Sequence, residues 1–144
     1  MNAFRFRLER VLKFRQTQLE LEENRFRQQA AQISRLDQER AEAWAEGFHV
    51  EHEVRRWRDL AGKDLAALDA FRLAVRARAR RMAERRVELV RLLAEQEARM
   101  LEARRRERLL ERLRGRRLAE WVVAWDREME AFASEAFLAR WRRS

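Results

Sequence analysis

The sequence contains no cysteine, no proline and no tyrosine, and it has only three glycines among its 144 residues. Without cysteine the chain has neither a disulfide nor a thiolate ligand for a metal, which suits a reducing compartment. Without proline, no residue breaks a long helix by removing a backbone N–H. There is no run of about 18 apolar residues, so we expect no membrane-spanning helix.

The first ten residues also lack the apolar stretch of a secretory signal peptide. Charged residues interrupt the apolar ones at every second position, as in Phe4-Arg5-Phe6-Arg7-Leu8. A signal peptide needs a continuous apolar region of at least seven residues. We therefore expect a cytoplasmic protein.

Charged residues make up 41% of the chain, with alanine, leucine, glutamate and arginine dominant. This composition is typical of long helices and coiled coils. We expect an all-α fold in which residues 1–144 form a single coiled-coil domain with a thin apolar seam. The net charge of +9 comes almost wholly from arginine. Most arginines alternate with glutamates, as on the solvated faces of a coiled coil, although an anionic partner has to be considered.

A seven-residue repeat of apolar residues indicates two helices. The first runs from about residue 4 to about residue 58 and the second from about residue 65 to about residue 141. The first repeat runs through Leu12, Leu19, Phe26 and Ile33, and continues with Arg40, Gly47 and Val54. The second runs through Leu68, Val75, Met82, Leu89, Leu93, Met100 and Leu110. Polar residues occupy several seam positions, so we expect loose pairing between the helices.

The repeat loses phase at residues 59–64, where we place the turn. Gly62 suits the left-handed conformation that often follows a helix end, and Asp64 is suited to cap the next helix. A fold about this turn pairs residues whose numbers sum to about 122, such as Ile33 with Leu89. The two seams then meet in phase, which predicts an antiparallel hairpin.

The predicted pairing leaves the second helix longer than the first. From about residue 118 onward, about 25 residues overhang the end of the first helix. Residues 121–141 of this overhang contain three of the five tryptophans. Part of the stretch is able to fold back against Phe4 and Phe6. The remainder is surplus apolar surface, which we expect to bind a partner.

A second group of large apolar residues lies near the turn. Trp44 and Phe48 are one helical turn apart on the first helix, and Phe71 and Val75 are one turn apart on the second. The predicted fold brings both pairs to neighbouring levels. They form either a layer of the core or an exposed patch, and the sequence favours neither.

Motifs for catalysis or cofactor binding are missing. Gly62-Lys63 lacks the earlier glycine of a nucleotide-binding loop. His49 and His52 supply two imidazoles on one helix, whereas a structural zinc site requires four ligands. A two-helix hairpin offers no enclosed cavity for perturbing carboxylates. We expect no enzyme activity, no cofactor, no metal and no small-molecule substrate.

Two arginine clusters, within residues 76–86 and 104–117, are the strongest charge feature. A basic-zipper protein would place such a cluster directly before a regular leucine seam, and this chain has none beside either cluster. An acidic protein groove or channel is therefore the better counterpart. We do not expect a nucleic-acid partner, but the sequence alone leaves RNA and DNA open.

Two terminal motifs resemble those of the FliJ family of flagellar type III export proteins. The start, Phe4-x-Phe6-x-Leu8-x-x-Val11-Leu12-x-x-Arg15, looks like the opening motif of that family. Near the end, Met129-Glu130-Ala131-Phe132-Ala133 is similar to its Met/Leu-Asp-Glu-Phe/Leu-Ala element. Glu130 replaces the usual aspartate and Ala131 the usual acid, so the charge pattern of this contact differs. The resemblance covers nearly the full length.

The resemblance implies a non-enzymatic stalk similar to the central shaft of rotary ATPases. The terminal end would enter a hexameric flagellar export ATPase, and the hairpin end would face the cytoplasmic domain of the transmembrane export gate protein. Export chaperones are further implied partners, with peripheral attachment at the cytoplasmic face of the inner membrane and no direct membrane insertion. The expected ATPase contacts are Phe4, Phe6, Trp121, Trp125, Met129 and Phe132. The expected gate contacts are Trp44, Phe48, Phe71 and Val75.

Three alternatives remain on the sequence alone. The first is the corresponding stalk of a virulence-type secretion system. The second, from another class, is an arginine-rich helical protein that binds nucleic acid, for which a steep salt dependence of binding is diagnostic. The third is a generic coiled-coil scaffold whose aromatic end closes a homodimer.

Overall fold

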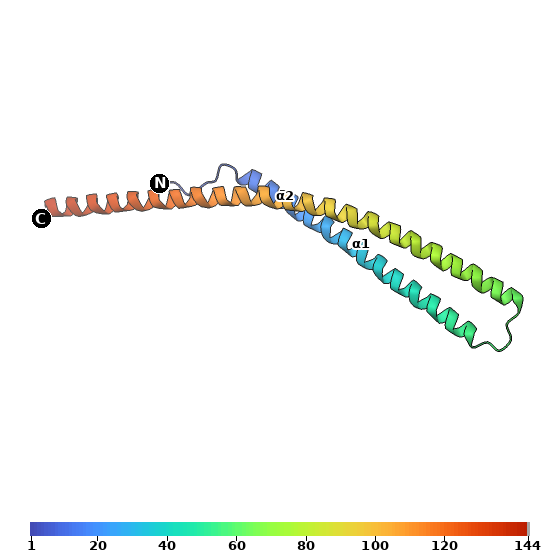
Figure 1. Cartoon of the computed structure of the whole chain (residues 1–144). Helices are drawn as coiled ribbons and strands as arrows, with labels where there is room; N and C mark the ends of the chain where they lie inside the picture. The colour runs from blue at the N-terminus through green and yellow to red at the C-terminus, as the bar shows by residue number, and fades with distance from the viewer. Residues whose placement is uncertain (144) are drawn as a thin grey trace. The chain divides into compact units, whose positions relative to one another are not determined.

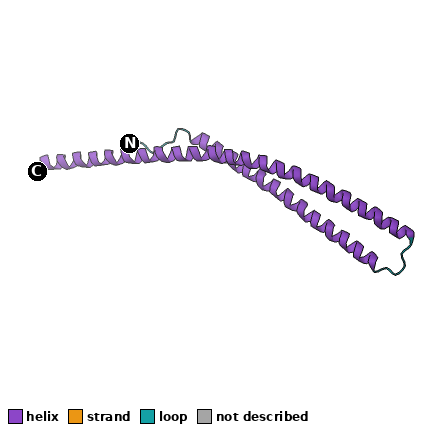
Figure 2. Cartoon of the chain, viewed as in Figure 1, coloured by secondary structure: helices purple, strands orange, loops and turns teal. Residues whose placement is uncertain are grey.

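The chain forms two α-helices joined as an antiparallel hairpin, and the second helix is the longer (Figures 1 and 2). The computed structural model describes residues 1–143. Helix α1 spans Glu9–Arg55 and helix α2 spans Gly62–Arg143, and no strand occurs within residues 1–143. The expected all-α fold is confirmed. The chain divides into two compact units: residues 1–21 with those from 100 onward form the terminal unit, and residues 22–99 form the hairpin unit.

The helix boundaries differ from the predicted ones at the start of the first helix and at both sides of the turn. Helix α1 begins at Glu9 rather than at about residue 4, and it ends at Arg55. Helix α2 begins at Gly62, so this glycine is the first residue of a helix and not the residue after one. No residue between 1 and 143 has a positive φ angle. The connection therefore consists of residues 56–61 and uses no left-handed glycine.

Asp64 caps helix α2, but from a position inside it. Its Oδ2 accepts a hydrogen bond of 3.0 Å from the backbone N–H of Ala61, the residue before the helix. This is half of a capping box, in which an acidic side chain at the third helical position reaches back to the helix start. The prediction that Asp64 precedes the helix was wrong, because Ala61 occupies that position.

The apolar core of the hairpin unit is the predicted seam. Ile33, Leu36 and Leu89 are buried together, and the half-buried Met82 and Leu93 pack against them. The prediction that Ile33 packs next to Leu89 is confirmed. Two ion pairs across this seam follow nearly the same numerical rule, since in each the residue numbers sum to 123. They are Asp37–Arg86 at 2.8 Å and Glu51–Arg72 at 2.5 Å.

One seam position of the hairpin unit is polar and fully buried. Gln96 is only 1% exposed, and its Nε2 donates a 3.1 Å hydrogen bond to the backbone carbonyl of Glu22. The same nitrogen donates to the Glu22 carboxylate, which also accepts from Arg25 at 3.3 Å. A buried amide needs such partners because it loses its hydrogen bonds to water. These bonds also favour one register, since a shifted pairing would leave the amide unsatisfied.

The terminal unit repeats the two-helix arrangement with fewer residues of α1. Leu12 and Met100 are its buried apolar side chains. Gln16 Nε2 donates to Glu111 at 3.1 Å, and Arg114 pairs with Glu9 at 3.2 Å. The residue numbers of the second pair again sum to 123, as in the two ion pairs of the hairpin unit.

Candidate interaction surfaces

The non-helical residues 1–8 cover the first part of the aromatic stretch on α2 (Figure 2). The ring centroids of Phe4 and Trp121 are 6.2 Å apart. Trp121 Nε1–H donates a 3.2 Å hydrogen bond to the backbone carbonyl of Asn2. Phe4 and Phe6 are two positions apart, and both are half-buried. A spacing of two places both rings on one side of an extended chain, but not on one face of a helix.

The cover formed by residues 1–8 reaches as far as Glu128. The amino group of Met1 pairs with the Glu128 carboxylate at 3.2 Å. Trp125 stacks on Trp121 with a centroid distance of 5.5 Å, and both rings are half-buried. The uncovered part of α2 therefore begins near residue 129. The sequence placed the overhang of α2 beyond the first helix at about residue 118 and allowed part of it to fold against Phe4 and Phe6. The contact of Phe4 with Trp121 agrees with that alternative. The cover extends as far as Glu128 because a non-helical chain spans more length per residue than a helix.

Every described residue from 126 onward is exposed, and the large apolar ones form what we call the C-terminal surface. Its members are Met129, Phe132, Phe137, Leu138 and Trp141. Phe132 is 66% exposed and Trp141 is 73% exposed. The sequence prediction included Met129 and Phe132 and missed Phe137 and Trp141. Their spacing of four residues, one turn apart on a helix, was a usable signal.

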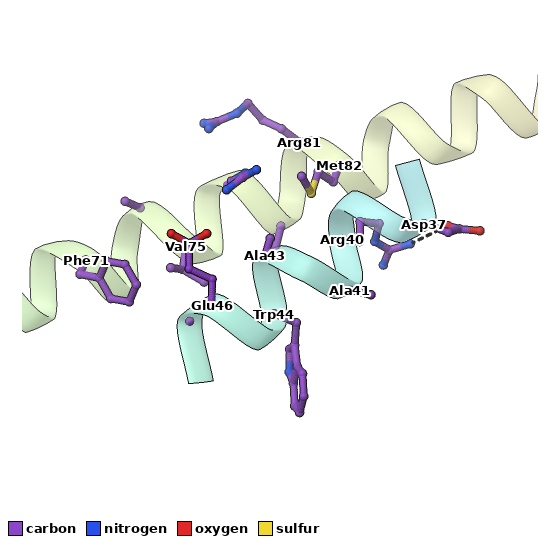
Figure 3. Close-up of a pocket in the computed structure, with 14 residues that line it drawn as sticks. Asp37, Arg40, Ala41, Ala43, Trp44, Glu46, Phe71, Val75, Arg81 and Met82 are labelled. Carbon is purple, nitrogen blue, oxygen red and sulfur yellow. Dashed lines mark ion pairs between the residues drawn. The ribbon is translucent and has the colours of Figure 1, made fainter. Parts of the chain in front are cut away.

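A second exposed aromatic group lies on α1 in the hairpin unit. Trp44 is 74% exposed, and its ring stacks on Phe48 at a centroid distance of 5.8 Å. His52 stacks in turn on Phe48 at 6.3 Å. Figure 3 shows the Trp44 ring directed away from α2. Of the two alternatives, the exposed patch therefore describes Trp44 and Phe48, and the core layer does not.

Phe71 and Val75 lie on α2 at the same level and are half-buried. They help to line a groove of about 560 Å³ between the helices of the hairpin unit, together with Ala43 and Ala79 (Figure 3). Small residues keep this groove open: the nearest methyl group of Val75 would lie only 3.7 Å from a Cβ placed on Gly47. Of the four predicted gate-contact residues, Trp44, Phe71 and Val75 thus line the groove, and Trp44 and Phe48 are the exposed aromatic pair at its side.

Two ion pairs lie at or near this groove, since Asp37 lines it and Glu51 and Arg72 line the neighbouring hollow. A hydrogen bond from Arg72 lowers the pKa of Glu51, and one from Arg86 lowers the pKa of Asp37. Both carboxylates therefore stay ionised at neutral pH. The charges of Asp37 and Glu51 are matched by these guanidinium groups, while Arg78 and Arg81 add positive charge to the lining of the groove.

An arginine face on α2 is the main basic feature of the terminal unit. Its residues recur every three or four positions, and so they share one side of the helix. The four arginines are Arg104, Arg105, Arg108 and Arg112, and Leu101 and Leu109 lie among them. Glu102 partly offsets this charge: hydrogen bonds from Arg105 and Arg106 lower its pKa to about 2.

Within residues 1–143, no group of three or more histidine, cysteine or acidic side chains is placed to hold a metal ion. Neither helix, over the same residues, contains a stretch long and apolar enough to span a membrane. Comparisons with protein-family models, with curated proteins and with solved structures gave no match for this chain.

Proposed function

We propose that this chain is a non-enzymatic stalk protein of a flagellar type III export apparatus. Its C-terminal surface binds a hexameric export ATPase. The exposed aromatic pair of its hairpin unit, Trp44 and Phe48, binds the cytoplasmic domain of the transmembrane export gate protein. The motifs at Phe4–Arg15 and Met129–Ala133 support the system, because they resemble those of the FliJ family. In this proposal the protein is cytoplasmic, attaches peripherally through the apparatus and also meets export chaperones.

The observation that carries the proposal is the uncovered C-terminal surface. Large aromatic side chains contribute most of the energy of protein interfaces, and each buries roughly 150–250 Å² when it is enclosed. Phe132, Phe137 and Trp141 are each more than half exposed in this chain. At 100° per residue, Phe137 and Trp141 lie on the other side of α2 from Phe132, so these exposed rings suit a partner that surrounds the helix.

Charge supports a pore or groove as the counterpart. Three arginines, Arg140, Arg142 and Arg143, lie in the last turn of α2 beside the apolar rings. An acidic channel would attract this end and raise the association rate, and that attraction falls as salt increases. Trp121 and Trp125 have a different part in this proposal. They hold residues 1–8 against α2, and so they shape the start of the surface.

The experiment is a binding and stimulation assay with the purified export ATPase. We expect Phe132→Ala combined with Trp141→Ala to abolish capture and stimulation of the ATPase. The matched control is Phe14→Ala, which removes an exposed ring of α1 in the same unit. Full stimulation by the double variant, with helicity unchanged in circular dichroism, would rule out this contact.

The gate contact needs its own test. We expect Trp44→Ala with Phe48→Ala to lose binding to the cytoplasmic gate domain and to keep binding to the ATPase. Leu73→Ala, on an exposed position of α2 in the same unit, is the control. Binding to a virulence-type ATPase and not to the flagellar one would assign the chain to that system instead.

The arginine face favours a second candidate function, binding of nucleic acid. Four arginines on one side of α2 are able to contact successive phosphates. In this case binding to RNA or DNA would persist at about 0.15 M salt with a steep salt slope. Arg108→Ala with Arg112→Ala would reduce that slope. Loss of binding at this salt concentration would exclude the candidate.

A further inference from the structure

A stripe of apolar residues runs along the last part of α2, from residue 118 onward. Its members alternate in steps of four and three residues, which is the heptad spacing of a coiled-coil seam. They are Leu118, Val122, Trp125, Met129, Phe132, Ala136 and Ala139. The cover from residues 1–8 ends at Glu128, and Trp125 is the only half-buried member of the stripe, since the other six are exposed. Residues 125–143 therefore carry one half of a seam without its second helix.

The order of side-chain sizes along this seam is self-complementary. Large residues come first, as Met129 and Phe132, and small ones follow, as Ala136 and Ala139. If a second copy runs antiparallel with its centre at residue 134, Phe132 meets Ala136 of that copy and Met129 meets Ala139. Each layer then pairs a large residue with a small one, which fills space between helices evenly. A parallel pairing would instead set Phe132 against Phe132 and alanine against alanine.

The charges beside the seam are also self-complementary. Acidic residues flank its first half and basic residues its second. In the antiparallel arrangement Asp126 faces Arg140 of the second copy, and Glu128 faces Arg142. Symmetry doubles each contact to give four opposite-charge pairs, against one like-charge contact between the two copies of Glu135. The parallel arrangement gives only the pair of Glu135 with Arg140, formed twice.

We propose that residues 125–143 of α2 are a self-pairing surface that binds a second copy of this chain in antiparallel orientation. On pairing, Glu128 exchanges the Met1 amino group for Arg142 of the second copy. At 3.6 residues per turn, Phe137 and Trp141 lie more than a quarter-turn from the seam, so their rings stay uncovered in the dimer. The inference goes beyond the proposed function and does not rest on it; where both hold, the ATPase and the second copy compete for Met129 and Phe132.

The first test is sedimentation equilibrium of the whole chain over a range of concentrations. We expect a reversible dimer whose dissociation constant rises about tenfold or more in Arg140→Glu with Arg142→Glu, because attraction becomes repulsion at four contacts. Adding Asp126→Arg and Glu128→Arg to this variant restores the dimer, since the charges are then exchanged. Arg108→Glu with Arg112→Glu, on the arginine face, leaves the constant unchanged. A chain that stays monomeric up to about 1 mM would overturn the proposal.

The second test fixes the orientation and uses the absence of cysteine from the natural sequence. We expect a mixture of Met129→Cys and Ala139→Cys chains to form a disulfide between the two variants on oxidation. Ala139→Cys alone does not cross-link, because the two copies of this residue lie roughly 15 Å apart along an antiparallel pair. Efficient cross-linking of Ala139→Cys alone would show a parallel dimer and refute the antiparallel surface.

Discussion

Leu89 is the position where the packing of the hairpin unit is most sharply testable. It is 6% exposed and lies in the core cluster with Ile33 and Leu36. The substitution Leu89→Ala removes three carbon atoms from this cluster. At about 0.8 kcal/mol for each buried carbon, the lost transfer free energy is about 2.4 kcal/mol.

The cavity left by Leu89→Ala should add little to this value. In a deep core, the unfilled space can raise the cost of a leucine-to-alanine change to about 5 kcal/mol. Here the cluster lies between only two helices, and the adjoining Met82 and Leu93 are half-buried. Water or a shift of these flexible side chains is able to fill the gap. We therefore expect the free energy of unfolding to fall by about 2–3 kcal/mol.

The matched control is Leu73→Ala on the same helix and in the same unit. Leu73 is 65% exposed, so the identical chemical change removes little buried area. We expect a loss below about 1 kcal/mol. Both variants are measured by urea unfolding, followed by circular dichroism at 222 nm. Equal losses in the two variants would refute the pairing of α1 with α2 through the Ile33–Leu36–Leu89 cluster.

Three further predictions follow from single residues. Gly47→Ala and Gly115→Ala should each raise the free energy of unfolding by about 0.8–1 kcal/mol in urea titrations, because alanine favours a helix interior and no atom would lie closer than 3.7 Å to the added Cβ. The Glu102 carboxyl should titrate with a pKa of about 2 in NMR, and Arg105→Ala should raise it. Because this pKa is lowered by folding, its stabilising effect is present above about pH 4.5 and is lost as the pH falls toward 2. Asp64→Ala should cost about 0.5–1 kcal/mol and speed amide exchange in the first turn of α2, whereas Asp64→Glu should cost less.

Ion pairs between arginines and carboxylates should make the stability of the fold sensitive to acid. Hydrogen bonds from arginines lower the pKa of Asp37, Glu51 and Glu88 as well as that of Glu102. All four carboxylates favour the folded state when ionised, and the effect disappears when they are protonated. Helicity should therefore fall as the pH is lowered below about 4.5, and added salt should weaken the same interactions at neutral pH.

The sequence by itself determined the two helices, their antiparallel order and their register. The seven-residue repeat predicted which faces meet, and the rule that paired numbers sum to about 122 agrees with the cluster of Ile33 and Leu89. Periodicity is informative here because a long helix presents one narrow apolar stripe, and two such stripes can join in few ways. The all-α class required only the composition.

Tertiary structure alone decided how the ends of the helices are covered. The apolar pattern of Phe4 and Phe6 predicts a helix that begins at about residue 4. In the structure these residues instead form a non-helical segment over Trp121. The indole N–H of Trp121 donates to the Asn2 carbonyl of that segment, a contact between residues 119 positions apart that no local pattern predicts. Gln96 is a similar case, because its polarity predicts exposure and its hydrogen bonds to Glu22 permit burial. In each case a long-range contact outweighed a local pattern, and so the uncovered surface of α2 begins near Met129.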